Sequence, residues 1–490
     1  MTDPIPPSPT PSSPTPRSSN TSGTPTPRSR PARSRPDRPL AAVALGALLL
    51  VGAYAGATAV FSARAQTLTA DLTATLRARA AASGAQVEPV SYTRGFTHSI
   101  QVLRLTFSEG GTSQGLIVTN DIQHGPLPAF RGVGQATVTT TFRPEDPQAQ
   151  AAYARAFPNR QPQIVTAIGL AGDTHSRVDV PGGTVTEQGT TVNWQPLGGT
   201  MDVQGNDTRL NLSWPGLTVS DPGDGQPTSG SIGRVTLTGE NRRNGPEDPI
   251  GLGRATLTLD RASLDADADS MNLTGLNISA DTTAQGGYLN STVKYDVGTL
   301  TLPGPDGPQS LRDLQLHLSL GHLAREPLAR LATLLNEAPA LKETPTAPDP
   351  ADPFATLDPA RQAQARADLL TLLKDTPVLR LERLNVTQPG GNVTLTGQFS
   401  LPGAASLSDP ELQGLADQPA AALSLADVQL KLSGTQAALN TLLGSAGPFA
   451  QMVDTETLIG AGYLTRSGDQ LSLDLRFEQG RATLNGQPLD

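Results

Sequence analysis

Short alternations of apolar and polar residues recur along most of the chain after residue 89. In each of them an aliphatic or aromatic residue occupies every second position, and mostly polar or small residues stand between. A period of two is typical of a β-strand that buries one face and exposes the other, as strands of antiparallel sheets do. The clearest examples are Leu103–Phe107, Val235–Leu237, Leu257–Leu259, Val293–Val297, Leu314–Leu320, Leu379–Leu381, Val393–Leu395 and Leu471–Phe477. We therefore expect antiparallel sheets with one buried and one solvated face.

The first predicted strand contains a slip in this alternation. Ile100 and Val102 alternate with polar residues, and Leu103 then starts a second alternation on the other parity. An extra residue of this kind predicts a β-bulge at that point. The Gly-rich segment Glu109–Gly115 and the apolar residues Leu116–Val118 follow, and together they predict a β-hairpin.

Segments with helical spacing and few Gly or Pro residues interrupt the strands. The predicted helices are Asp146–Phe157, Ala324–Leu341, Pro359–Leu373, Asp409–Ala416 and Thr435–Leu443, with a further one at Ala65–Ala82. These helices are short compared with the extent of the strand pattern. The predicted fold class is therefore α+β and β-dominated, with antiparallel sheets and interspersed short helices, preceded by one N-terminal transmembrane helix.

The transmembrane prediction rests on Leu40–Ala63, a segment of 24 residues without a charge. At about 1.5 Å per residue such a helix reaches about 36 Å, enough for a hydrocarbon core of about 30 Å. The preceding tail carries six Arg residues and two Asp residues. Because positive charge stays on the cytoplasmic side, we expect the N-terminus to be cytoplasmic and the body to lie outside.

A cleaved signal peptide is the alternative for the same segment, because Ala63 and Ala65 have the spacing of a cleavage site. The apolar stretch is longer than the usual signal core of about 7–15 residues, which favours a retained anchor. Gly52 and Gly56 form a GxxxG spacing, from which a homodimer of anchor helices is a hypothesis. Small residues are frequent throughout the segment, and this alone could account for the spacing.

Composition divides the chain into four parts. Residues 1–39 are rich in Pro, Ser, Thr and Arg and are expected to be a disordered cytoplasmic tail, and residues 40–63 are the anchor. Residues 64–342 form a β-rich extracytoplasmic domain. The Pro-rich stretch Glu343–Pro353 is the predicted internal boundary, and residues 354–490 form a portion in which helices alternate with hairpins.

Charge and composition exclude several classes of function. The chain has a net charge of −9, and the body after the Arg-rich tail is more acidic still, which argues against nucleic-acid binding. Without Cys it can form no disulfide, thiol nucleophile or cysteine metal site. Aromatic residues make up only 4% of the chain, which argues against stacking platforms for bases or sugars.

Two motifs resemble functional sites, and each has a simpler explanation. Gly111–Gly115 matches the nucleophile pattern GxSxG, but a strand follows it instead of a helix, so a hairpin turn is expected. Asp265, Asp267 and Asp269 resemble the start of a calcium loop that lacks its later Gly and Glu residues. We therefore assign no catalytic, cofactor-binding or metal residue.

The five histidines lie far apart in the sequence, and none has the spacing of a metal motif. They are His98, His124, His175, His317 and His322. His317 is expected on the solvated face of its strand. His124 is followed by Gly and Pro at a strand end, where a hydrogen-bonded structural role is expected.

Several segments together resemble the YdgA-like family of bacterial proteins, a family of unknown function. The segments are Tyr92–Phe96, Asp121–Pro128, Pro377–Leu384, Phe477–Gly480 and Leu484–Pro488. The resemblance implies an inner-membrane protein with its body in the periplasm, as the charge argument does independently. The family offers no established catalytic residue to carry over.

We expect a non-enzymatic envelope protein whose body binds or guides a partner in the periplasm, with lipid or another envelope protein as the partner. A lipid would need the apolar faces of the sheets to form an open surface instead of a closed core. One alternative is a periplasmic hydrolase with a site built from dispersed Asp, Glu and His residues. Another is a structural protein of envelope assembly that acts through its sheet edges.

Overall fold

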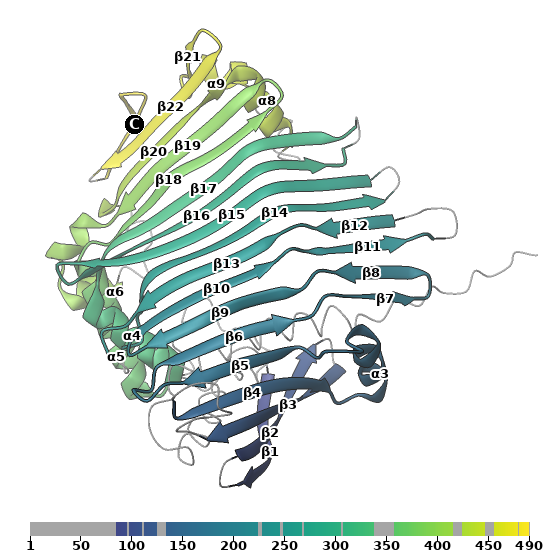
Figure 1. Ribbon diagram of the computed structural model, residues 1–490. Helices are drawn as coiled ribbons and strands as arrows, with labels where there is room; N and C mark the ends of the chain where they lie inside the picture. The colour runs from purple at the N-terminus through teal and green to yellow at the C-terminus, as the bar shows by residue number, and fades with distance from the viewer. Residues whose placement is uncertain are drawn as a thin grey trace, which may run out of the picture.

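The computed structural model describes residues 85–95, 98–109, 112–124, 134–223, 228–245, 248–266, 269–304, 307–337, 357–414, 424–445, 455–478 and 480–489. Within them the chain forms one 24-stranded antiparallel sheet with helices at its margins (Figure 1). This confirms the prediction of a β-dominated antiparallel fold. The predicted tail, anchor, first helix and Pro-rich boundary lie outside the described residues. Within the described part, no helix has the length and apolarity needed to cross a bilayer.

The first strands follow one another in the sheet in chain order. They are β1 (Ala85–Arg94), β2 (His98–Glu109), β3 (Thr112–His124), β4 (Ala136–Pro144) and β5 (Gln163–Ile168). The predicted hairpin of β2 and β3 is confirmed, because the two strands pair from end to end. The prediction of a bulge within β2 is wrong. The register shift lies in β1, where Val90 is left without a partner, and Val102 and Leu103 occupy opposite faces of a regular strand.

Each of the next four long strands is interrupted once and is therefore divided into two shorter strands that run end to end. The halves are β6 (Thr174–Val180) and β7 (Gly183–Glu187), β9 (Leu197–Gln204) and β8 (Thr190–Trp194), β10 (Asp207–Trp214) and β11 (Leu217–Asp221), and β13 (Val235–Arg242) and β12 (Thr228–Ile232). Each interruption is two residues long and contains Pro or Gly, which weaken a strand because Pro lacks an N–H group and Gly lacks a side chain. The breaks lie side by side in the sheet, since Gln195 N–H donates to Gly216 O and Gly233 N–H donates to Arg261 O.

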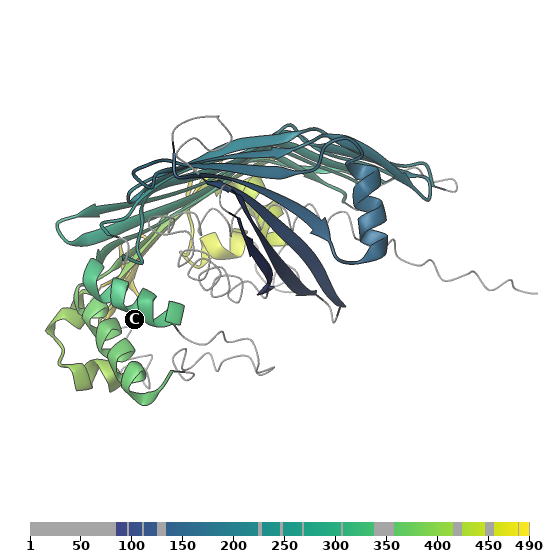
Figure 2. The same ribbon diagram turned by 60° about the horizontal axis from the view of Figure 1, so that its bottom comes forward.

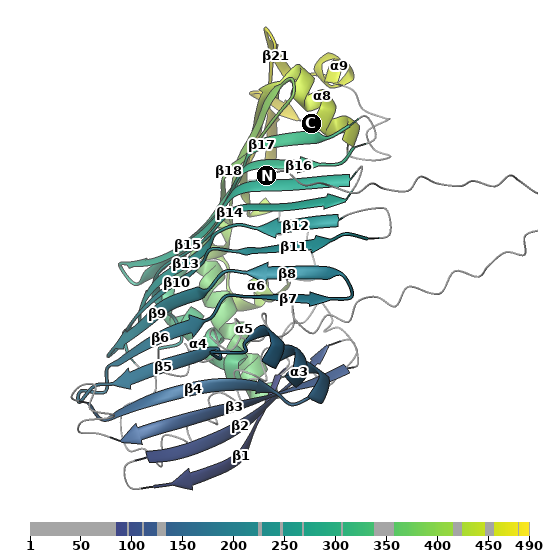
Figure 3. The ribbon, with the colours of Figure 1, turned by 45° about the vertical axis from the view of Figure 1, so that its right-hand side comes forward.

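The line of breaks, which we call the crease, continues through unbroken strands. It starts at Pro181–Gly182, Gln195–Pro196, Pro215–Gly216 and Gly233–Arg234, and it continues through Asp260, Gly275, Gly298 and Asp313. Gly275 and Asp313 have φ values of 66° and 50°, which bend the strands there. Figure 3 shows the resulting bend of the sheet from the side.

The remaining strands complete the sheet. They are β14 (Leu252–Ala266), β15 (Asp269–Gln285), β16 (Tyr288–Leu302), β17 (Gln309–Ala324), β18 (Val378–Gln388), β19 (Gly391–Ser400), β20 (Asp427–Thr435), β21 (Thr465–Ser467), β22 (Gln470–Glu478), β23 (Arg481–Leu484) and β24 (Gln487–Leu489). From β13 to β20 they pair in chain order, and β22 follows β20. Since β17 pairs with β18, the sheet is continuous across the predicted boundary at Glu343–Pro353.

The helices agree with the sequence pattern. They are α3 (Pro147–Ala156), α4 (Arg325–Glu337), α5 (Pro359–Lys374), α6 (Asp409–Gly414), α8 (Gln436–Ser445) and α9 (Thr455–Gly460), with a 3-10 helix, η3 (Pro402–Ser406). The first five of these confirm the five predicted helices, whereas α9 and η3 were not predicted. Asp146 and Asp358 cap α3 and α5 by accepting backbone N–H bonds of the first turn, and Pro occupies the first position of both helices.

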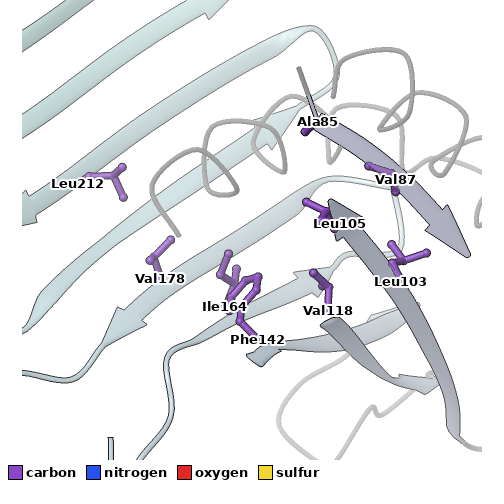
Figure 4. Packing of buried hydrophobic residues seen from close by; sticks show 9 residues of the cluster. All are labelled: Ala85, Val87, Leu103, Leu105, Val118, Phe142, Ile164, Val178 and Leu212. Atoms are coloured by element: carbon purple, nitrogen blue, oxygen red, sulfur yellow. The ribbon is translucent and has the colours of Figure 1, made fainter. Parts of the chain in front are cut away.

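The sheet is strongly curved. In Figure 2 it forms an arch, and β1–β3, α3, α4 and α5 all lie on its concave side. The largest hydrophobic cluster is also on this side, at the N-terminal end, where Val87 of β1 and Leu212 of β10 belong to one buried group (Figure 4). Between them the same cluster contains Leu103, Val118 and Ile164.

Candidate functional site

The register of the strands shows that one face of the sheet is apolar over most of its extent. Side chains of directly paired residues point to the same face, so pairing defines rows across the strands. Three successive rows are Trp214, Val235, Leu259, Leu276, Val297 and Leu314; Leu212, Leu237, Leu257, Ile278, Tyr295, Leu316, Leu384, Leu395, Leu432 and Leu473; and Leu210, Gly239, Ala255, Ala280, Val293, Leu318, Leu381, Gly397, Leu430 and Leu475. We call these rows the apolar face.

From β17 onward a fourth row extends the apolar face. It consists of Leu320, Leu379, Phe399, Val428 and Phe477. The apolar face is the concave one, because Leu210, Leu212 and Leu237 pack in the cluster that Figure 4 shows beside β1.

On the far side of the crease, the apolar residues lie on the same concave face. At the crease, consecutive apolar residues of a strand are three positions apart, for example Leu259 and Ala262. In a regular strand, two residues three positions apart would point to opposite faces of the sheet. The ring of Trp194, which lies beyond the crease, contacts Phe157 at the end of α3, 5.6 Å between centroids. Because α3 lies on the concave side in Figure 2, the crease keeps both apolar halves on one face.

Packed elements close the apolar face at its two ends. At the N-terminal end the residues from β1 to β10 are buried in the large cluster described above. At the C-terminal end α8 packs on β19 and β20, and its Ala438 and Leu439 form one buried cluster with Val393 and Leu471. Gly390 permits this approach, since a Cβ there would lie 3.0 Å from the Cβ of Ala437 in α8.

Between these ends the apolar face is open. In β13–β18 none of the described side chains in the rows is buried. Several large apolar side chains of this region are 38% to 46% exposed: Leu264, Met271, Tyr295, Leu320, Leu379 and Leu384. The prediction that one face is buried is therefore wrong for β13–β18, although the alternation itself is confirmed.

The open part is as large as the largest apolar patch of a typical monomeric protein. Six strands spaced about 4.8 Å apart and seven residues at about 3.3 Å each cover about 24 Å by 20 Å. That is on the order of 500 Å², in the range of the largest apolar patches of monomeric proteins, and such patches are often functional. Hydrogen bonds to neighbouring strands already use the backbone groups here, so the surface offers a ligand mainly hydrocarbon contact.

The convex face of the same strands is polar. Thr236 and Thr258 are hydrogen bonded across the strands, and Arg254 Nε donates to Asp281 Oδ2 at 3.1 Å. His317 lies on this face, as predicted, with Nε2 2.8 Å from Asp296 Oδ1. In these strands the sheet therefore separates a solvated face from an apolar one.

At the rim of the sheet, the hairpin ends carry charges. Arg242 donates two hydrogen bonds to the carboxylate of Asp207, at 2.6 and 2.7 Å. The hydrogen bond from Arg242 lowers the pKa of the exposed Asp207 carboxyl. The rim is thus ionic where the apolar face ends.

Each histidine has a specific partner, and the structure does not bring them together. His98 Nε2 lies 2.9 Å from Asp121 Oδ1, and His175 Nδ1 lies 2.5 Å from Asp202 Oδ1. His322 stacks on Tyr288. Among the described residues, no three His, Cys, Asp or Glu side chains are grouped closely enough to hold a metal ion.

A Ser–His contact exists at His124. Ser99 Oγ lies 2.8 Å from His124 Nε2 on the concave face of β2 and β3, and Ser99 is almost completely buried. A catalytic triad also needs a carboxylate on the histidine. No hydrogen bond or ion pair joins His124 to a carboxylate within the described part of the chain, and His175 has its Asp202 without a Ser.

The other two motifs lie in hairpins. Ser113 is in β3 and pairs with Ser108 of β2, so a strand follows the GxSxG segment, as predicted. Asp265 is at the end of β14 and Asp269 starts β15, and Asp267 lies outside the described residues. Thr112–Gly115 are therefore part of a paired strand and not of the predicted turn, and Asp265 and Asp269 lie at the paired ends of two adjacent strands.

A sequence profile for a family described as "Bacterial protein of unknown function (DUF945)" matches residues 39–490. The chain belongs to this family. The match includes the predicted anchor and every strand of the sheet, so the curved sheet with its open apolar face is the family region itself. Searches of curated proteins and of solved structures found no match.

Sequence reasoning found the apolar rows but not their exposure. The alternation in β14–β18 is the same as in strands that bury one face, and nothing in those strands distinguishes a covered row from an open one. The feature of the sequence that could have predicted this exposure is the scarcity of helices able to cover the apolar rows. Between β13 and β18 the described chain supplies only α4 and α5 as helices, and these lie at one end of the strands.

Proposed function

We propose that this chain is an envelope protein that is anchored in the inner membrane and holds lipid acyl chains on its apolar face in the periplasm. The observation that carries the proposal is the open stretch of apolar side chains across β13–β18. Burial of each CH₂ group of an acyl chain there contributes about 0.8 kcal/mol, so a long chain has a large driving force for binding. The role needs no catalysis, and we propose a binding or guiding protein.

An acyl chain fits this surface better than an extended peptide does. A peptide laid on the apolar face would bury backbone N–H and C=O groups with few partners, and each unpaired group would cost on the order of 1–3 kcal/mol. A hydrocarbon chain has no such groups. Another envelope protein could bind the same face through a helix, and this is the main rival partner.

The location is also part of the proposal. It is supported by the charge-free segment 40–63 and by the Arg-rich tail in front of it. The finer assignment to the YdgA-like family is supported by the five motifs quoted above. A reporter enzyme that is active only in the periplasm should be active when it is fused to the C-terminus, and activity of a cytoplasmic reporter there would contradict the orientation.

The binding test uses two adjacent residues on opposite faces of β14. Leu257 is in the apolar face, and Thr256 is on the convex face beside it. Purified full-length chain in a mild detergent should contain co-purified lipid by native mass spectrometry and, after delipidation, should bind a fluorescent fatty acid. Leu257→Asp should weaken this binding at least tenfold, whereas Thr256→Asp should leave it unchanged.

Two results would overturn the lipid proposal. One is the absence of lipid in the purified protein together with no binding of the fluorescent acid. The other is an equal effect of both substitutions, because binding would then not depend on the apolar face.

A hydrolase is the second candidate, and the contact between Ser99 and His124 favours it. The burial of Ser99 and the missing carboxylate partner among the described residues count against it. Ser99→Ala should abolish any ester hydrolysis by the purified protein if this candidate holds. A role in assembly through the edge of β7, which pairs only with β8 among the described strands, is the third candidate.

A further inference from the structure

A cavity of about 410 Å³ lies on the convex face, where β15 turns into β16 and β17 pairs with β18. This volume is within the range of about 300–1,000 Å³ that is typical of small-molecule sites. Its lining includes Gln285, Tyr288, Asn290, His322 and Arg380. These side chains are polar or aromatic, and no Asp or Glu lines the cavity. The site is therefore distinct in place and in chemistry from the apolar face.

A β-bulge shapes one wall of the cavity. Asn290 of β16 faces two residues of β17, Gly321 and His322, because the register shifts between Leu289 and Ser291. Asn290 Oδ1 accepts the N–H bond of His322 at 3.2 Å, and His322 has a φ of 58°. Bulges and left-handed non-Gly residues cost free energy and are found preferentially where a side chain must be aimed at a site.

The ring of His322 is held in place from two sides. It stacks on Tyr288, with 4.0 Å between centroids and 14° between the planes. Its Nδ1 bonds to the backbone carbonyl of Asp375, and because a carbonyl only accepts, Nδ1 carries a proton. The wall is thus a rigid pair of rings.

Arg380 supplies the charge of the site. Its Nε donates to Gln398 Oε1 at 3.0 Å, and among the described residues no carboxylate lies within ion-pair distance of its guanidinium. Arg254 on the same face, by contrast, forms an ion pair with Asp281. A guanidinium without an anionic partner is well suited to bind a phosphate or carboxylate through two parallel hydrogen bonds.

We propose that this cavity is a binding site for an oxyanion, the phosphate or carboxylate group of a small molecule or of a lipid head group. Arg380 would bind the oxyanion, and Asn290 and Gln285 would supply neutral hydrogen bonds around it. The cavity is larger than one phosphate needs, so the remaining volume beside Tyr288 and His322 accommodates the organic part of the ligand. This site does not depend on the proposed binding of acyl chains, which concerns the other face of the sheet.

The test compares two arginines of β18 that share the convex face. Arg380 lines the cavity, whereas Arg383 is outside it and bonds to Gln315. Full-length protein is titrated with inorganic phosphate and with acetate in a calorimeter, and its flotation with vesicles of phosphatidylglycerol is compared with that of phosphatidylcholine vesicles. Arg380→Gln should weaken the binding of the oxyanion at least tenfold, Arg380→Lys should restore part of it, and Arg383→Gln should leave it unchanged.

The two arms distinguish the sources of the ligand. Saturable binding of phosphate or acetate that depends on Arg380 indicates a soluble ligand. Flotation with the anionic vesicles that depends on Arg380, without binding of the free ions, indicates a head group, and both results support the site. Binding that Arg380→Gln and Arg383→Gln reduce equally, or no binding in either arm, would overturn it.

Discussion

Leu320 of β17 and Leu379 of β18 lie directly opposite each other in the sheet, next to the pair Gly321 and Val378. Their side chains are 38% and 46% exposed. Two leucines paired in the middle of a long sheet would ordinarily be part of a core. Here they are part of the open apolar face, where selection for binding explains their chemistry better than selection for stability does.

The first prediction follows from this exposure. Leu379→Ser should lower the free energy of unfolding by less than about 1 kcal/mol, because the side chain has little packing to lose. A leucine in a closed core would cost about 2–5 kcal/mol on truncation. Chemical denaturation of the full-length protein, followed by circular dichroism, measures the difference. A loss of several kcal/mol would show that Leu379 is covered in solution and would contradict an open face.

Leu103 is the matched case in the closed cluster. It is 2% exposed and lies in the group that joins β1 to β10. Leu103→Ala should therefore cost about 2–5 kcal/mol, since the cavity it leaves cannot collapse fully. The same denaturation experiment measures it, and a cost equal to that of Leu379→Ser would mean that the two ends of the sheet are packed alike.

The crease gives a prediction about glycine. Gly216 has a φ of 123°, and a Cβ there would lie 2.0 Å from Ile232 O, whereas Gly205 has a φ of 57° and nothing within 4 Å of its Cβ position. Gly205→Ala should cost only the backbone strain, about 1 kcal/mol. Gly216→Ala should cost clearly more, because a backbone carbonyl of the neighbouring strand must also move. Similar melting temperatures for the two variants would show that the crease tolerates a side chain.

Much of this architecture was predictable because it follows from local patterns. The alternation around Leu257 and Leu316 identifies strands, and Asp146 or Asp358 before a Pro identifies a helix start. The crease was not predicted, although Pro181, Pro196 and Pro215 were visible in the sequence. Each Pro on its own indicates only an interruption, and their alignment into one line depends on the register of pairing.

The sites were less predictable because they depend on contacts between residues far apart in the chain. Asn290 and His322, or Ser99 and His124, meet only when the strands pair in one register. The open face depends on what fails to cover it, and a strand has no sequence signal for the absence of a neighbour. For this reason the lipid hypothesis could be stated from the sequence, and its structural requirement could be examined only in the fold.

Tyr153 of α3 provides a prediction about an unpaired polar group. Its side chain is 6% exposed, packs 5.0 Å from the ring of Phe157, and its hydroxyl has no hydrogen-bond partner in the described part of the chain. Burial raises the pKa of this hydroxyl far above its usual range. Tyr153→Phe removes a polar atom that is costly to bury, so it should leave stability unchanged or raise it by up to about 1 kcal/mol. A loss of more than 1 kcal/mol in chemical denaturation would show that the hydroxyl has a partner.

The pH dependence of stability should depend in part on Asp248, whose carboxylate accepts a bond from Arg325 Nη2 at 2.6 Å and from Ile250 N–H at 3.0 Å. Burial by itself would raise the pKa of Asp248, but these hydrogen bonds and the charge of Arg325 outweigh it, so the pKa is lowered. A carboxyl whose folded pKa is depressed contributes stability above its unfolded pKa, about 3.9, and loses it as the pH falls through the folded value.

Asp248→Asn should therefore be less stable than the native chain at pH 7, on the order of 1–3 kcal/mol, and the difference should shrink as the pH falls below about 4. Melting temperatures at pH 7, 5 and 3.5 measure this. Asp281→Asn is the control, because its ion pair with Arg254 is solvent exposed and such pairs contribute only about 0–1 kcal/mol. A difference for Asp248→Asn that stays constant or widens in acid would contradict the assignment, because the contribution of a carboxylate must disappear once it is protonated.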